Sequence, residues 1–388
     1  MQKLLIVFYA LWQNAVNNIC FHTAKQTNRV LIIFQQIFGD SVIFSSAIQG
    51  YSDYFVKDKG MSVTFLCRPS IAKFLSAVAP IPDTIDVETI DYFKLVNNFS
   101  YFKEISNYYR RYADIIVVPG TSASAELLSS TLIAKQRVGL VGSVRRKWPL
   151  HLVLFQKLAY TNIVLSDFDA MIIQNHRKLL GYLGKKDFKG KLPILKKQVR
   201  IIEGDYCVVC PSSSMSMKCW PIDRFAVVCD WIIENYGWSI HLCGGNGEEE
   251  VAARLIGMSV HRERIVSHVG STSFADWSSI IEYAQIVVGN DSATLHIAAG
   301  HRVKAVCIVG VWEKLQYYPY KVDELNEGDR LPVIVQKDFP CASCRTKGYY
   351  AGYGNKECRK AISLGSCSMC IEGIKTDEVI RAIEKLLE

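Results

Sequence analysis

The sequence has 388 residues, of which 49% are hydrophobic, 11% aromatic and 21% charged, and its formal net charge is +8. This composition supports large buried cores and excludes a globally disordered chain. The length predicts two domains, and the modest, diffuse positive charge suits an anionic substrate or a membrane surface and gives no indication of nucleic acid as a partner.

Residues 1–28 precede the first predicted strand and form an N-terminal extension. One lysine is followed by nine apolar residues, Leu4 to Trp12. That run is too short to span a bilayer, and no cleavage site of the A-x-A type follows it. We expect a packing helix or a helix that lies on a membrane surface, and we regard a secretory signal or anchor as the weaker alternative.

Short β-branched runs then alternate with longer amphipathic stretches, which predicts buried parallel strands joined by helices. In the first half the strands are expected at 30–34, 62–67, 114–120, 137–142 and 162–167. The lysine-rich stretch 184–200 interrupts the alternation and is interpreted as a linker. The pattern restarts with strands at 206–211, 239–245, 285–291 and 303–310, and with helices near 222–236, 247–257, 274–284 and 292–300.

The predicted fold class is therefore α/β, with two doubly wound Rossmann-like domains facing a cleft. The first domain is assigned to residues 29–190 and the second to residues 191–373. A last helix, 374–388, is expected to pack back toward the first domain. Ligands of such sheets bind beyond the carboxyl ends of the strands, so polar motifs that directly follow strands are the candidate site residues.

The first such motif is Phe38-Gly39-Asp40, after the strand at 30–34. Gly39 permits a tight turn, and Asp40 is either a helix N-cap or a general base that faces the cleft.

The second motif is PSSSMSMKCWP, residues 211–221. Ser212 and Ser213 offer donors to a phosphate group, and Lys218 offers a positive charge to a leaving group. The alternative is a flexible serine-rich loop with a surface lysine.

The third motif is HLCGGNGEEE, residues 241–250. Gly244 and Gly245 let the backbone approach a ligand, and Glu248 lies near the start of a helix. It is not a GxGxxG fingerprint, and a plain strand-to-helix turn is the alternative.

The fourth motif is GNDSATLH, residues 289–296, where a strand ends and a helix begins. Asp291 is predicted to be the helix N-cap, and Ser292, Ala293 and Thr294 would supply the first free N–H groups to a phosphate. His296 would lie on the ligand side of the first turn. The alternative is a capped helix with a packed histidine.

Taken together, the four motifs resemble glycosyltransferase family 9, the ADP-heptose:lipopolysaccharide heptosyltransferases. Gly39-Asp40, the K-x-W-P of residues 218–221, Gly244-Gly245 with Glu248, and GNDSATLH occur in the family's order. The resemblance extends from about residue 29 to the C-terminus. Two departures stand out: Ala293 occupies a position where the family usually has glycine, and Ser212-Ser213 replaces a glycine-containing loop.

The resemblance implies a GT-B fold and inverting transfer from ADP-heptose without a catalytic metal. Asp40 would deprotonate the acceptor hydroxyl. Lys218, the N–H groups of Ser292 to Thr294 and Ser213 would meet the charge that develops on the diphosphate. Asp291 would accept hydrogen bonds from sugar hydroxyls. His296 would contact phosphate or brace the loop. The donor site would also include Ser212, Gly244, Gly245, Glu248 and Ala293.

A basic turn follows a strand of the first domain at Arg145-Arg146-Lys147. It is a candidate acceptor-binding site for an anionic glycolipid or glycan, and a solvated surface turn is the alternative. Peripheral contact with the inner membrane would accompany such an acceptor.

Thirteen cysteines, an odd number, indicate a reducing and therefore cytoplasmic location. Five of them crowd into residues 341–370: Cys341, Cys344, Cys358, Cys367 and Cys370. Two CxxC pairs predict tetrahedral thiolate binding of a structural zinc or iron, with one thiol to spare. Free clustered thiols and disulfides are the alternatives. Similar cysteines bind iron in some family members that resemble autotransporter heptosyltransferases.

Three functions are compatible with these patterns. The first is heptose transfer to a lipopolysaccharide core or related surface glycan. The second is heptose transfer to serines of an autotransporter-like surface protein. The third is a non-catalytic GT-B binding protein, which would be expected to lack the base or the leaving-group cation, whereas Asp40 and Lys218 are both present.

Overall fold

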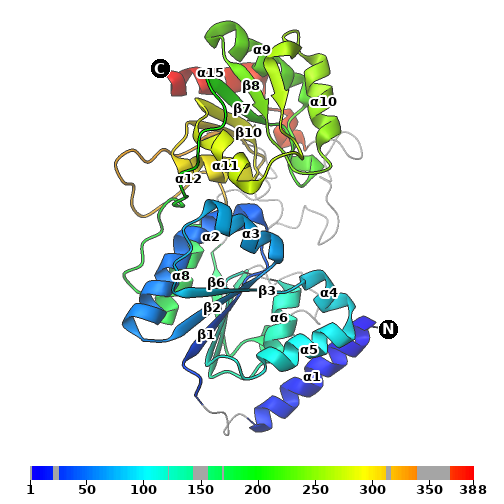
Figure 1. Cartoon of the computed structure of the whole chain (residues 1–388), viewed down its shortest axis with the longest axis vertical. Coiled ribbons are helices and arrows are strands. Elements are labelled where there is room, and N and C mark those ends of the chain that lie inside the picture. The colour runs from blue at the N-terminus through cyan, green and yellow to red at the C-terminus, as the bar shows by residue number, and fades with distance from the viewer. Residues whose placement is uncertain are drawn as a thin grey trace. The chain divides into compact units, whose positions relative to one another are not determined.

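The computed structural model describes residues 2–20, 26–120, 122–142, 156–167, 170–311, 316–338 and 368–388. The chain divides into two compact units, residues 1–76 with 80–190 and residues 77–79 with 191–388. Each unit contains a six-stranded parallel sheet with helices packed against it (Figure 1). The predicted α/β class with two doubly wound sheets is confirmed.

The first unit begins with a helix and continues as alternating strands and helices. Its strands are β1 (Arg29–Ile33), β2 (Ser62–Cys67), β3 (Ile85–Thr89), β4 (Ile115–Val118), β5 (Gln136–Gly142) and β6 (Asn162–Ser166). Its helices are α1 (Gln2–Cys20), α2 (Phe38–Tyr51) with a π-helical turn at Ser52–Asp58, α3 (Pro69–Val78), α4 (Tyr92–Asn97), α5 (Phe99–Tyr109), α6 (Ala123–Ser130) and α8 (Ile172–Leu183).

The second unit repeats this alternation. Its strands are β7 (Tyr206–Cys210), β8 (Ser239–Leu242), β9 (Ile265–Ser267), β10 (Ile286–Asn290), β11 (Ala305–Ile308) and β12 (Val333–Val335). Its helices are α9 (Ile222–Tyr236), α10 (Glu249–Met258), α11 (Phe274–Glu282), α12 (Ala293–His301), α14 (Met369–Glu372) and α15 (Thr376–Leu387), with short 3₁₀ turns at Ser216–Lys218 and Arg262–Arg264.

Both sheets have the same strand order. In the first the order is β3-β2-β1-β4-β5-β6, and in the second, read from its other edge, it is β9-β8-β7-β10-β11-β12. This is the doubly wound arrangement in which the strand order reverses beside the first strand. The crevice at that reversal lies between β1 and β4 in one unit and between β7 and β10 in the other. The loops after these four strands are therefore the expected ligand-binding positions.

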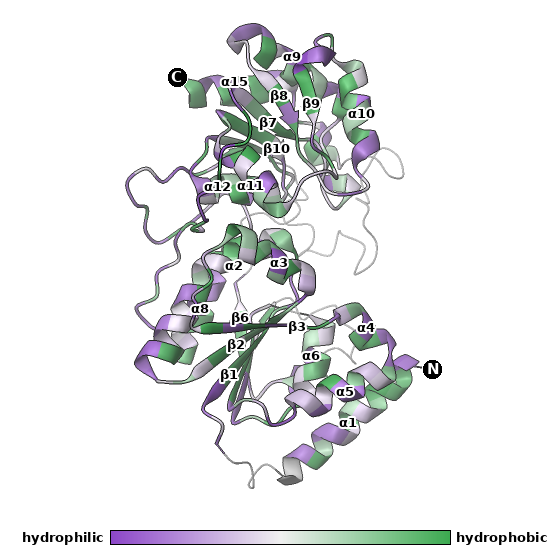
Figure 2. Ribbon diagram, viewed as in Figure 1, coloured by the Kyte–Doolittle hydropathy of each residue, from purple (hydrophilic) through white to green (hydrophobic). Residues whose placement is uncertain are grey.

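The central strands are apolar because helices cover both faces of each sheet. Every residue of β7 and β10 is buried, as are the last four residues of β1. Such strands read as continuous hydrophobic runs with no alternation, which is how the sequence revealed them. Figure 2 shows hydrophobic strands flanked by helices that carry both hydrophobic and hydrophilic residues. On one face of each sheet, buried side chains of the described residues form a hydrophobic core, one in each unit.

The last helix, α15, packs on the second unit, which corrects the expectation that it returns to the first. Val379 and Ile383 are fully buried in the same core as the strands of the second sheet. The helix contacts α9, β11 and β12. The helix is strongly amphipathic. Its single apolar stripe is therefore buried against the second sheet.

Candidate active site

Three of the four sequence motifs meet at the carboxyl edge of the second sheet. Strand β7 pairs with β10 on one side and with β8 on the other, all in parallel. The loops that follow these strands are residues 211–221, 291–292 and 243–248. Because parallel strands end at the same edge, segments about 80 residues apart in the sequence become neighbours.

The ion pair between Lys218 and Asp291 is the centre of this cluster. Lys218 ends the short turn Ser216–Lys218, and its Nζ lies 2.7 Å from Asp291 Oδ2. The two side chains are only 13% and 10% exposed. At that depth each charge depends on the other, because an unpaired buried charge is strongly unfavourable. The expected phosphate-binding lysine and the expected sugar-binding carboxylate thus contact each other directly.

The start of α12 differs by one residue from the prediction. Ser292 is the N-cap, and Asp291 precedes it, so the assignment of Asp291 as the N-cap was wrong. The Asp291 side chain turns to Lys218, and its backbone carbonyl accepts a hydrogen bond from Ser213 Oγ at 3.0 Å. The first amides of α12 have no partner within the helix, which is the usual basis of anion binding at a helix N-terminus.

Ala293 is the first residue of α12, at the position where the family usually has glycine. Among the described residues other than glycine, a positive φ occurs only at Asn28 and Arg302. Ala293 therefore needs none of the backbone freedom of glycine. The departure noted in the sequence leaves the helix start intact.

Asn290 joins two of the loops, and the sequence analysis assigned it no role. Its Nδ2 donates to the carbonyl of Pro211 at 2.7 Å, and its Oδ1 accepts from the backbone N–H of Trp220 at 2.9 Å. The side chain is fully buried. The sequence GNDS contains this residue, but nothing in that motif shows that the side-chain oxygen and nitrogen both bond the loop after β7.

Glu248 organises the third loop. It is the residue before α10, and its Oε2 accepts from the backbone N–H of Gly245 at 2.9 Å. Burial raises the pKa of this carboxyl, and hydrogen bonds from Gly245 and Ser212 oppose that rise. A Cβ on Gly244 would lie 2.6 Å from Glu248 Oε2, so the glycine leaves space for the carboxylate. Ser212 and Glu248 thereby connect the loops after β7 and β8.

His296 is buried and packed between tyrosines. Its ring stacks on Tyr318 with centroids 5.1 Å apart, and its Nδ1 lies 2.8 Å from the hydroxyl of Tyr320. Burial lowers its pKa to about 4, so the ring is neutral near pH 7. This is the packed histidine that was the alternative in the sequence analysis. The two tyrosines were missed there because nothing in the run YYPY (317–320) relates it to a residue 22 positions earlier.

Asp40 lies at the corresponding edge of the first sheet. It is in the first turn of α2, whose N-cap is Ile37, so Asp40 is not the cap. The residue is 7% exposed. The neighbouring loop residue Gln35 accepts a short hydrogen bond from Ser124 of α6, so the loops after β1 and β4 are joined beside the strand reversal. The carboxylate thus occupies the expected ligand-binding edge of its unit.

Two groups of predicted residues lie outside the described part of the chain. These are Arg145, Arg146 and Lys147, and four of the five cysteines: Cys341, Cys344, Cys358 and Cys367. Cys370 is described; it is buried in the second core, and its Sγ lies 3.1 Å from Ser368 Oγ. Within the described ranges, His, Cys, Asp and Glu side chains form no group of three or more that could hold a metal ion.

Residues 101–341 match the model of glycosyltransferase family 9 (heptosyltransferase), which is more than half of the chain. The chain belongs to glycosyltransferase family 9. A relative with this similarity is lipopolysaccharide heptosyltransferase 3 of Escherichia coli K12, 26% identical over 120 residues. That alignment covers 31% of this chain and 35% of the relative, so the match to this curated relative spans about a third of its length.

Solved family 9 structures share the fold over nearly the whole chain. The glycosyl transferase of family 9 from Veillonella parvula is 16% identical, with a TM-score of 0.70 over 92% of this chain and 97% of its own. The E. coli ADP-heptose lipopolysaccharide heptosyltransferase II is 14% identical, with a TM-score of 0.62 over 92% and 98%. At these identities the likeness establishes the fold of a family 9 glycosyltransferase.

Proposed function

We propose that the chain transfers a heptose from ADP-heptose to a lipopolysaccharide core or a related bacterial surface glycan. Family membership and the names of the similar E. coli proteins support this choice. The observation that carries it is the Lys218–Asp291 pair beside the first amides of α12. Lys218 and the first N–H groups of α12, which have no partner within the helix, suit a diphosphate, and the adjacent carboxylate suits sugar hydroxyls.

The donor would be held by the second unit. Lys218 and the N–H groups of Ala293 and Thr294 bind the diphosphate, and Ser213 adds a hydroxyl donor. Asp291 keeps Lys218 in place and accepts hydrogen bonds from the sugar. Because these donors are already assembled, they stabilise negative charge on the departing ADP with little reorganisation. Ser212, Gly244, Gly245 and Glu248 line the donor site, with His296 bracing it from behind.

Asp40 is the proposed base of an inverting displacement that needs no catalytic metal. The acceptor oxygen forms a bond to the anomeric carbon of the heptose as the bond from that carbon to the β-phosphate oxygen breaks. The acceptor's proton passes to the Asp40 carboxylate, and ADP leaves with the bonding electron pair. A carboxylate of such low exposure keeps a defined direction, which suits a general base.

The remaining assignments are proposals of the same origin. Arg145, Arg146 and Lys147 would bind the anionic groups of the acceptor. The cysteines at 341, 344, 358, 367 and 370 would hold a structural zinc or iron that ties down their loop, since paired thiolates favour either metal. Burial of Cys370 fits a structural role better than a solvent-exposed redox role. The thirteen cysteines favour a cytoplasmic location.

A donor screen tests the activity. Purified protein is incubated with ADP-heptose, UDP-sugars or GDP-sugars and a heptose-deficient lipopolysaccharide, and products are read by mass spectrometry. Transfer from ADP-heptose alone is expected, and Lys218→Ala should reduce it. Transfer only to serine-containing peptides of a surface protein would replace the acceptor assignment, and no transfer from any donor would refute the proposal. Metal analysis of the same preparation tests the cysteine site; less than about a tenth of an equivalent of zinc or iron would contradict it.

A further inference from the structure

Helix α1 exposes large apolar side chains on the face that points away from its own unit. Five large apolar residues are 41–66% exposed: Leu4, Leu5, Phe8, Leu11 and Trp12. Their spacing places them in one stripe of the helix. The opposite stripe is buried and contains Ile6, Ala10, Gln13, Asn14 and Asn17. Ordinary amphipathic helices place large apolar residues inward and amides outward, so α1 is inverted along part of its length.

The buried stripe attaches α1 firmly to the first unit. Asn14 Nδ2 donates to the carbonyls of Ser130 at 2.9 Å and Leu158 at 3.1 Å. Asn17 Nδ2 donates to the carbonyl of Thr131 at 2.7 Å. These hydrogen bonds from asparagine side chains fix the rotation of the helix about its own axis, because rotation would leave buried polar groups unpaired. The outward direction of the apolar stripe is therefore set by the fold.

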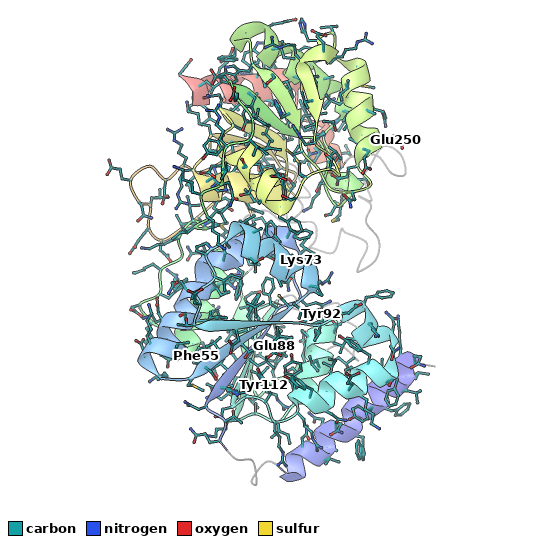
Figure 3. The ribbon with its side chains drawn as sticks, in the orientation of Figure 1. Phe55, Lys73, Glu88, Tyr92, Tyr112 and Glu250 are labelled. Carbon is teal, nitrogen blue, oxygen red and sulfur yellow. The ribbon has the colours of Figure 1, made fainter. Side chains whose placement is uncertain are left out.

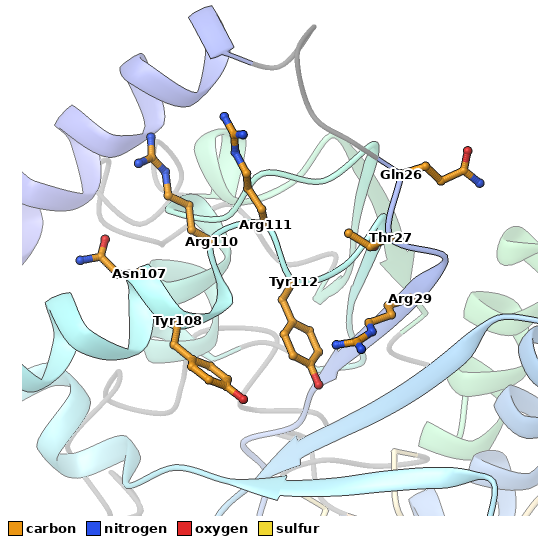
Figure 4. Close-up of a pocket in the computed structure, with 8 residues that line it drawn as sticks. All are labelled: Gln26, Thr27, Arg29, Asn107, Tyr108, Arg110, Arg111 and Tyr112. Atoms are coloured by element: carbon orange, nitrogen blue, oxygen red, sulfur yellow. The ribbon is translucent and has the colours of Figure 1, made fainter.

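An arginine-lined pocket adjoins the C-terminal half of α1. It has a volume of about 670 Å³ and is lined by Gln26, Thr27, Arg29, Asn107, Tyr108, Arg110, Arg111 and Tyr112. Figure 4 shows Arg110 and Arg111 extending side by side from the end of α5. Asn17 Oδ1 of α1 accepts from Arg110 Nε at 3.1 Å and Nη2 at 3.0 Å, which joins the pocket wall to the helix.

The acids near this pocket are engaged by neutral donors. Glu88 accepts from the hydroxyl of Tyr112 at 2.6 Å and also contacts Tyr109; Figure 3 labels Glu88 and Tyr112 on neighbouring segments. Asp114 accepts from the backbone amides at the end of the pocket. Within the described part of the chain, none of the three pocket arginines forms an ion pair with a carboxylate. Residues 2–20 contain Lys3 and no acid. The pocket therefore presents positive charge next to the C-terminal half of α1.

We infer that the outer stripe of α1 and the pocket arginines dock this protein on the surface of a membrane rich in anionic phospholipid. The apolar side chains of the stripe, including Phe8 and Trp12, enter the boundary between headgroups and acyl chains, and the arginines bind lipid phosphates. Among the described residues, no helix is both long and apolar enough to cross a membrane. A second copy of the chain is a poorer occupant because the copies share a net charge of +8 and the same positive region.

Vesicle flotation of the full chain tests this docking surface. The vesicles are phosphatidylcholine alone or phosphatidylcholine with about a quarter phosphatidylglycerol. Binding is expected on the anionic vesicles and should weaken as salt is added. Phe8→Ser with Trp12→Ser should reduce binding about tenfold or more. The matched control is Val260→Ser, which removes an exposed apolar side chain from the second unit and should change nothing.

The charge component has its own pair of variants. Arg29→Gln with Arg111→Gln should remove most of the preference for anionic vesicles. Arg254→Gln with Arg262→Gln makes the same change in net charge on exposed positions of the second unit and should leave the preference intact. Equal loss in both pairs would show that only net charge matters and would overturn the assignment of the pocket.

Two results would overturn the proposal as a whole. One is no flotation with either vesicle by protein that shows a cooperative thermal transition. The other is self-association in sedimentation analysis that Phe8→Ser with Trp12→Ser abolishes without vesicle binding, which would make the stripe an interface between copies. The assay contains no donor or acceptor, so its outcome is independent of the proposed heptose transfer.

Discussion

The two sheets share a strand order but differ in what gathers at their carboxyl edges. In the second unit, three loops are tied to one another by Lys218, Asn290 and Glu248, which bond Asp291, Trp220 and Ser212 respectively. In the first unit, the described residues at this edge include the buried carboxylate of Asp40 and the hydrogen bond from Ser124 to Gln35. Identical topology thus produces the same strand reversal twice, and the side chains that gather beside it differ between the two units.

The substitution Asp40→Asn is expected to have the largest effect and tests the role of the first unit. If the first unit supplies only the base, turnover should fall about 10²–10⁴-fold while ADP-heptose affinity stays unchanged. Turnover is followed by mass spectrometry and affinity by calorimetry. Asp83→Asn, at an exposed position of the same unit, is the control and should leave both unaltered. Full activity of Asp40→Asn would remove Asp40 from the mechanism.

Asp291→Ala tests whether the bonding of the second unit stabilises the fold. It leaves Lys218 buried without its carboxylate, so the free energy of unfolding should fall by about 3 kcal/mol. The exposed pair Lys178–Asp167 has a similar separation, 2.9 Å, with side chains 43% and 61% exposed. Asp167→Ala should therefore cost less than about 1 kcal/mol. Equal costs in chemical denaturation would show that depth does not strengthen the Lys218 pair.

Acid should weaken the second unit through His296. Burial lowers its pKa from 6.5 to about 4, so between these values the unfolded chain binds a proton that the folded chain does not. Stability from this residue is complete above pH 6.5 and falls as the pH drops, by about 2 kcal/mol at pH 5. His296→Gln should flatten that pH dependence in denaturation curves. An unchanged slope in the His296→Gln variant would contradict this assignment.

Ala293→Gly should have the smallest effect. It restores the family's usual glycine at the first position of α12 and should lower the free energy of unfolding by about 0.5 kcal/mol, through the greater freedom of glycine in the unfolded chain. Donor affinity should not change, because the backbone already adopts the helical conformation. A large gain in ADP-heptose affinity would instead mean that the alanine methyl group obstructs the donor.

The central strands could be predicted from sequence, whereas three of the four edge strands could not. All nine expected strands were found. The three missed strands, β3, β9 and β12, lie at sheet edges. β3 has the sequence IDVET with mostly exposed side chains, and β9 and β12 have three residues each. An edge strand buries less surface and is often short or polar, so it lacks the apolar run that identifies a central strand.

By itself, the sequence determined the α/β class, the order of the four motifs and the family. These properties depend on residue type and spacing along the chain. Only the tertiary structure decided that Asp291 contacts Lys218, that Asn290 and Glu248 tie the loops together, and that His296 stacks on Tyr318. It also turned the apolar stripe of α1 outward. These contacts join segments distant in sequence, and their partners are chosen by strand order and by which buried polar groups must find a bond.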